Sequence, residues 1–147
     1  MKPLPANLTS EFDALAKKAW QVRDEGDLAL AESLLMKAWK LIPEPVFEYA
    51  VYPQVYSRVI VEFYRDSNQP AKAEEWLKVV RQAHSPMTNA SAASIEFLEA
   101  TVWHDGGKLN EAFAQFKNLH KQYKLRPFQD KQPRWKEFFL NRLKSEG

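Results

Sequence analysis

One spacing of small and apolar residues occurs three times in the chain, and it restricts the possible folds more than any other feature. The first copy consists of Leu15, Ala19, Val22, Gly26, Asp27, Leu28, Ala31, Leu35, Ala38 and Pro43. The second consists of Val61, Tyr64, Asn68, Ala73, Leu77 and Val80, and the third of Ala100, Trp103, Gly107, Leu109, Ala112, Phe116 and Leu119. Apolar residues three or four positions apart predict helices, and small residues let two helices pack closely. We therefore predict an all-α fold of three antiparallel helix hairpins, an array that commonly presents a surface to another molecule.

The expected helices follow from this spacing and from the turn residues between them. They cover residues 10–24, 28–41, 45–66, 71–83, 90–104, 109–123 and 133–143. Ser10 and Asp13 resemble a capping box at the start of the first helix, and Gly26 suits a turn that needs a positive φ. Pro70 is expected at the first position of the fourth helix. The polar stretch 84–89 is expected to be a flexible linker.

Pro53 leaves the segment 45–66 open to two interpretations. Either one long helix is kinked at Pro53, where a backbone hydrogen bond is missing, or a shorter helix begins there. We favour the long, kinked helix, because aromatic and aliphatic residues recur at helical spacing through the whole segment.

Length and composition indicate a single domain over 1–147, with units of roughly 10–43, 45–84 and 90–124 and a capping helix at 133–144. The chain of 147 residues has no cysteine, which excludes disulfides and cysteine-ligated zinc and suits a reducing cytoplasm. Residues 1–10 do not resemble a signal peptide, and no apolar stretch approaches the roughly 20 residues of a spanning helix. We expect a cytoplasmic protein with no membrane partner.

The residues that carry the repeat also indicate a family. Gly26-Asp27-Leu28 followed by Ala31, Leu35, Ala38 and Pro43 is similar to a tetratricopeptide repeat. The equivalent alanines Ala31, Ala73 and Ala112 lie 42 and 39 residues apart, so the array resembles a divergent member with long linkers. The segments 4–8, 41–45 and 127–138 resemble small bacterial three-unit proteins encoded beside polymorphic toxins. This resemblance implies an immunity protein that binds a cognate toxin, although Lys131, Arg134 and Lys136 stand where the family's ending is typically acidic.

The sequence contains no recognisable motif for catalysis or for cofactor binding. Gly106-Gly107 lacks the rest of any phosphate-binding loop, and His84, His104 and His120 have no histidine partner four residues away. Because these patterns are missing, we expect neither an enzyme, nor a cofactor, nor a metal site.

The repeat register predicts which side chains line the concave face of the array. The candidate partner-binding residues are Trp20, Arg23, Arg58, Glu62, Arg65, Phe97, Thr101 and His104. Trp and Arg are frequent anchors of protein interfaces, which favours this face as the binding surface. The alternative for Trp20 is that its ring simply packs on the neighbouring helix.

Charge is distributed unevenly along the chain, and this leaves a second surface open. Residues 1–116 have 12 Lys and Arg against 16 Asp and Glu, whereas residues 117–144 have 9 basic residues against only Asp130 and Glu137. A positive end of this kind attracts acidic partners.

The leading hypothesis is a protein-binding module, most concretely an immunity protein that occludes a toxin. The alternatives are a chaperone or adaptor that grips a peptide and, less favoured, nucleic-acid binding by 117–144, whose aromatics have core-like spacing.

Overall fold

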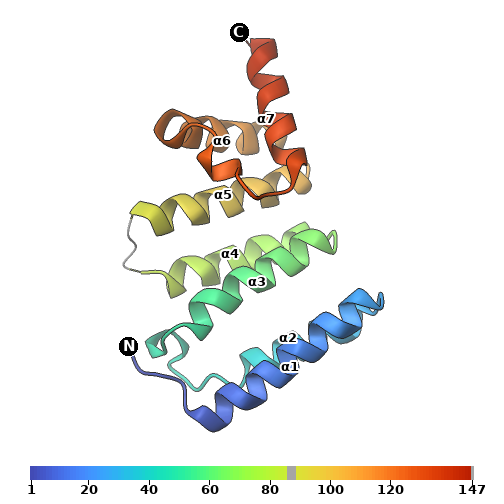
Figure 1. Ribbon diagram of the computed structural model, residues 1–147, viewed down its shortest axis with the longest axis vertical. Helices are drawn as coiled ribbons and strands as arrows, with labels where there is room; N and C mark the ends of the chain where they lie inside the picture. The colour runs from blue at the N-terminus through green and yellow to red at the C-terminus, as the bar shows by residue number, and fades with distance from the viewer. Residues whose placement is uncertain (86–88, 147) are drawn as a thin grey trace. The chain divides into compact units, whose positions relative to one another are not determined.

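The computed structural model describes residues 1–85 and 89–146, with side chains described for 1–85 and 92–146. These residues form an all-α fold without a β-strand, as the spacing predicts (Figure 1). The α-helices are α1 (Ala6–Asp24), α2 (Leu28–Trp39), α3 (Tyr52–Asp66), α4 (Pro70–Ala83), α5 (Asn89–Asp105), α6 (Leu109–Tyr123) and α7 (Pro133–Glu146), with short 3-10 helices η1 (Val46–Glu48) and η2 (Arg126–Phe128). None of these helices is both long and apolar enough to cross a bilayer. The chain divides into two compact units, Met1–Ile60 and Val61–Gly147, which are described in turn.

The first unit is built on the α1–α2 hairpin. Gly26 adopts a φ of 93° in the turn, a conformation that a residue with a side chain rarely takes. The side chain of Asp27 caps α2 by accepting a hydrogen bond of 3.1 Å from the backbone N–H of Leu30. Ala19 and Ala31 are fully buried, so the two helices approach closely where the repeat places its small residues.

Two predicted details of the first unit are wrong. The first helix begins at Ala6 rather than at residue 10, so Ser10 lies inside it and does not form the capping box. The third helix begins at Tyr52 rather than running kinked from residue 45. Pro53 therefore lies in the first turn, where its missing N–H removes no helical hydrogen bond, whereas an interior proline costs about 3 kcal/mol.

Before α3, backbone groups of Glu48 and Ala50 form hydrogen bonds with the N-terminal segment instead of within a helix. Lys2 and Tyr49 form an isolated parallel bridge, in which the N–H of Lys2 donates to the carbonyl of Glu48 at 2.9 Å. The N–H of Ala50 in turn donates to the carbonyl of Lys2 at 2.7 Å. Because these groups are satisfied by the N-terminal segment, the chain at 49–50 has no need of helical hydrogen bonds.

The second unit begins within α3 and contains the α5–α6 hairpin. Pro70 occupies the first turn of α4, as predicted, and Gly107 has a φ of 85° in the turn between α5 and α6. The helix predicted over 109–123 has these same bounds in the structure. Of the expected linker at 84–89, residues 86–88 lie outside the described residues.

Aromatic side chains fill the core of the second unit. Phe97 on α5 and Phe116 on α6 pack with Phe128 of η2, and α7 adds Trp135 and Phe139, which are 2% and 0% exposed. The rings of Phe128 and Phe139 stack with their centroids 5.5 Å apart. This packing fixes the start of α7 beside the end of α5, and the candidate site lies there.

Candidate functional site

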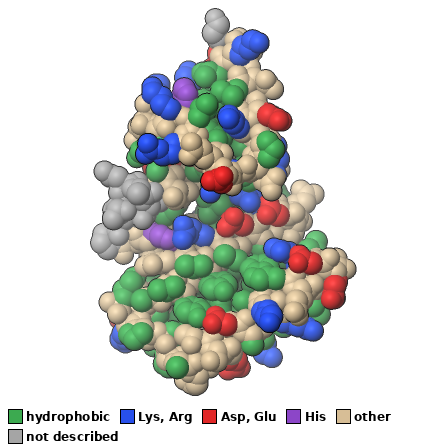
Figure 2. All heavy atoms as spheres, in the orientation of Figure 1, with side chains coloured by type: hydrophobic (Ala, Val, Ile, Leu, Met, Phe, Trp, Pro, Cys, Tyr) green, Lys and Arg blue, Asp and Glu red, His purple; other side chains and the backbone are tan. Residues whose placement is uncertain are grey.

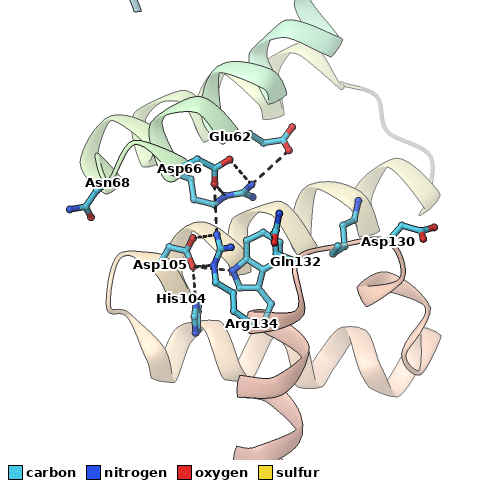
Figure 3. A pocket seen from close by; sticks show the side chains of 11 residues that line it. Glu62, Asp66, Asn68, His104, Asp105, Asp130, Gln132 and Arg134 are labelled. Carbon is cyan, nitrogen blue, oxygen red and sulfur yellow. Dashed lines mark hydrogen bonds and ion pairs between the residues drawn. The ribbon is translucent and has the colours of Figure 1, made fainter. Parts of the chain in front are cut away.

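An open pocket of about 800 Å³ lies in the second unit (Figure 3). Its walls come from the end of α3, the end of α5, the loop before α7 and the first turn of α7. The lining residues are Glu62, Arg65, Asp66, Asn68, His104, Asp105, Asp130, Lys131, Gln132, Arg134 and Trp135. Nearly all of these side chains are polar or charged, and both signs of charge are present.

Asp105 is the carboxylate that connects α5 to α7. Arg134 donates to it through two nitrogens, with Nη2 2.7 Å from Oδ2 and Nε 3.3 Å from Oδ1. The indole N–H of Trp135 donates to Oδ1 at 3.0 Å, and Nδ1 of His104 lies 2.8 Å from the same oxygen. The dashed lines in Figure 3 mark this set of contacts. Charged hydrogen bonds to one carboxylate hold the rim of the pocket in a single arrangement.

Burial and hydrogen bonding act in opposite directions on the pKa of the Asp105 carboxyl group. Burial by itself raises the pKa of this carboxyl, but the hydrogen bonds from Arg134, His104 and Trp135 outweigh burial and hold the pKa below its usual value. The last residue of a helix is also an unfavourable place for an anion, because carbonyl oxygens give that end a partial negative charge. The carboxylate is therefore stable at this position only while its donors are in place.

Arg65 and Trp135 form the floor of the pocket. The guanidinium of Arg65 lies 4.6 Å from the centroid of the Trp135 ring, and that of Arg134 lies 4.3 Å from the same centroid. The Arg65 side chain is only 7% exposed and also donates from Nη1 to the hydroxyl of Thr101 at 2.9 Å. Stacking on an aromatic ring and hydrogen bonding together keep this buried cation fixed.

Five of the predicted partner-binding residues belong to the second unit, and the structure brings four of them together. Glu62, Arg65 and His104 line the pocket. Thr101 is 0% exposed and lies behind them as the hydroxyl acceptor of Arg65. Phe97 is 5% exposed and packs edge-to-face on Trp135 in the core, so it supports the floor from beneath instead of lining the pocket.

The other three predicted residues lie in the first unit. Trp20 is half-buried, and the guanidinium of Arg23 lies 4.7 Å from the centroid of its ring. Arg58 is also half-buried, and its Nε donates to the carbonyl of Gln54 at 3.4 Å. Their contact with a partner stays a prediction.

Sequence reasoning missed most of the pocket. Asp66, Asp105 and Trp135 are not among the residues that the repeat register selects, and Arg134 enters only as part of the basic C-terminal stretch. Asp105 and Arg134 are 29 positions apart, and no local spacing links residues at that separation. The only sequence signal was indirect, since the repeat register placed Glu62, Arg65 and His104 on one face.

The pocket presents exposed charged and polar groups. Within the described residues, no three His, Cys, Asp or Glu side chains gather closely enough to hold a metal ion. The carboxylates of Glu62 and Asp66 are 51% and 56% exposed, and Asp130, Lys131 and Gln132 are exposed beside them. Such groups can form hydrogen bonds and ion pairs with a polar segment of another molecule.

Comparisons with protein-family models, with curated proteins and with solved structures gave no match.

Proposed function

We propose that this protein is a non-enzymatic protein-binding module, and that the pocket of the second unit is part of its binding surface. The observation that carries the proposal is that Glu62, Arg65 and His104 line one open pocket of about 800 Å³. These three residues were selected from the repeat register as binding residues. Fixed polar and charged groups at an open surface can form hydrogen bonds and ion pairs with a protein partner of complementary charge.

The physical support for binding is the rigidity of the pocket. Arg65 is fixed by Thr101 and Trp135, and the rim is fixed by the contact of Arg134 with Asp105. A preformed surface loses little conformational entropy when a partner binds, so more of the contact energy contributes to affinity. The exposed carboxylates and Lys131 on the rim would then select a partner of complementary charge.

The most concrete form of the proposal is a cytoplasmic immunity protein that occludes the active surface of a cognate bacterial toxin. Its support is the resemblance of the sequence to three-unit tetratricopeptide-like proteins. In this proposal Trp20, Arg23 and Arg58 of the first unit also contact the toxin.

The test uses the tagged full-length chain in extract of its native cells, with chemical cross-linking and mass spectrometry. A pocket variant, Glu62→Lys with Lys131→Glu, reverses two exposed rim charges without touching Asp105 or Arg134. A first-unit variant combines Trp20→Ala with Arg58→Glu. The control variant, Lys136→Glu with Lys144→Glu, changes two exposed lysines of α7 outside the pocket.

We expect one cross-linked protein to be captured by the unchanged chain and by the control, and to be lost from the pocket variant. Loss from the first-unit variant as well would support contacts between the first unit and the partner. The proposal fails if the pocket variant retains every partner while the control loses one. The immunity form is tested separately by co-expressing the chain with a toxin encoded next to its gene, and fails if the host cells are not protected.

A further inference from the structure

Two tyrosines of the first unit lie side by side at the start of α3. Tyr52 and Tyr56 are four positions apart, and their rings stack with centroids 5.8 Å apart and ring planes 14° apart. Phe12 of α1, which is 1% exposed, packs edge-to-face against both rings, with centroid distances of 4.8 Å and 4.5 Å. Both tyrosines are only half-buried, so part of each ring stays accessible to another molecule. Figure 2 shows hydrophobic and aromatic side chains gathered over one face of this unit.

The carboxylate of Asp13 lies at the edge of the tyrosine pair. The hydroxyl of Tyr52 donates to its Oδ1 at 2.9 Å. Asp13 is exposed, as is Lys17 one turn along α1, and no ion pair joins Asp13 to a cation within the part of the chain that the structure describes. Burial first, and the hydrogen bond to Asp13 second, raise the pKa of Tyr52 to about 12. The phenol therefore keeps its proton, and the negative charge lies on Asp13.

We propose that Tyr52, Tyr56 and Asp13 form a site on the first unit that binds an arginine side chain of another protein. Aromatic faces attract cations, and a carboxylate accepts short, charged hydrogen bonds from them. The guanidinium is planar, so it can stack on a ring and donate to a carboxylate at the same time, whereas the lysine ammonium is a compact point charge. The site uses residues of the first unit alone and does not depend on the pocket of the second.

The groups beside the site favour a cation over other occupants. An anionic side chain would be repelled by Asp13 and by the negative faces of the rings. A purely apolar side chain would cover an ionised carboxylate without giving it a partner, which is costly. Val55, one position before Tyr56 on α3 and 37% exposed, offers apolar surface for the methylene groups of an arginine.

The test follows the nuclear magnetic resonance spectrum of the isotope-labelled full chain while acetyl-Gly-Arg-Gly-amide is added. Both ends of this tripeptide are blocked, so the guanidinium is its only charge. We expect saturable shifts of the signals of Asp13, Tyr52 and Tyr56. The same tripeptide with citrulline, a neutral analogue of arginine, should shift them far less, and the tripeptide with glutamate should not shift them.

Two substitutions separate binding from folding. Asp13→Asn removes the charge but keeps an oxygen that can accept from Tyr52, and it should weaken binding by about tenfold, the loss expected for one charged hydrogen bond. Tyr56→Leu should also weaken binding, whereas Tyr56→Phe, which keeps the ring, should not. The matched control is Glu25→Gln, which neutralises an exposed carboxylate elsewhere in the first unit and should bind as the unchanged chain does.

The inference is overturned if the arginine tripeptide gives no saturable shifts, or if the citrulline tripeptide binds equally well. It is also overturned if Asp13→Asn binds as the unchanged chain does, or if Glu25→Gln loses as much affinity as Asp13→Asn. Shifts of the same signals when the chain alone is diluted would assign this face to a second copy of the chain instead.

Discussion

Arg134 at the start of α7 places its guanidinium on the carboxylate of Asp105 at the end of α5, with Nη2 2.7 Å from Oδ2 and Nε 3.3 Å from Oδ1. The contact joins two segments that both line one pocket. The same guanidinium stacks on Trp135, whose indole N–H donates to Asp105. The rim of the candidate site is thus held by a small set of charged and aromatic groups that can be changed one at a time.

Removing the guanidinium should destabilise the second unit. We expect Arg134→Ala to lower the free energy of unfolding by about 1–3 kcal/mol, because a half-buried carboxylate loses its charged donor. Urea denaturation measures the loss. Lys136→Ala, two positions along α7 and without an ion pair in the part of the chain described, should change stability by less than about 0.5 kcal/mol. If both variants unfold at the same urea concentration, Arg134 contributes nothing beyond an ordinary surface residue.

The stabilising effect of Asp105 should depend on pH in a defined direction. Its pKa in the folded chain lies below the ordinary value of 3.8, so the folded state binds the proton less readily than the unfolded state does. The contribution is fully present well above pH 3.8 and is lost as the pH falls through 3.8 and then through the lower folded pKa. The difference in unfolding free energy between the unchanged chain and Asp105→Asn should therefore shrink over that range. A difference that is constant from pH 6 to pH 3 would contradict this.

Large side chains at the repeat alanines should disrupt the hairpins. Ala31 and Ala112 are both 0% exposed at helix contacts, so Ala31→Trp or Ala112→Trp should overpack the contact by roughly 1–3 kcal/mol or more. The melting temperature followed by circular dichroism measures the effect. Ala114→Trp, two positions from Ala112 and exposed, is the matched control and should melt near the unchanged chain. Unchanged melting of both core variants would show that the repeat register is wrong.

The turn glycine Gly26 should resist substitution for backbone reasons alone. Its φ is 93°, and nothing lies within 4 Å of the position a Cβ would take, so the penalty is conformational rather than steric. Gly26→Ala should cost about 1–2 kcal/mol. Gly26→Asn should cost less, because asparagine tolerates a positive φ better than alanine does. Equal losses for the two variants in urea denaturation would argue for another cause.

The sequence by itself determined the helical class and most helix positions. Gly26 and Pro70 act through their own backbone preferences, and the structure has both in the expected roles. The period of small and apolar residues likewise defined helix 109–123 without reference to any distant contact. Where a local preference was ambiguous, as at Pro53, the sequence allowed two answers and the favoured one was wrong.

Only the tertiary structure decided which polar residues meet. The repeat register predicted that Glu62 and Arg65 of α3 and His104 of α5 line one face of the array, because helical periodicity is a local property that each repeat carries. It could not show that Arg134 and Trp135 would complete the pocket from α7, since their position depends on aromatic packing among α5, α6, η2 and α7. It could not show either that Lys117 and Arg134 are paired within the chain, because their partners Glu146 and Asp105 are distant in the sequence and only folding brings them close.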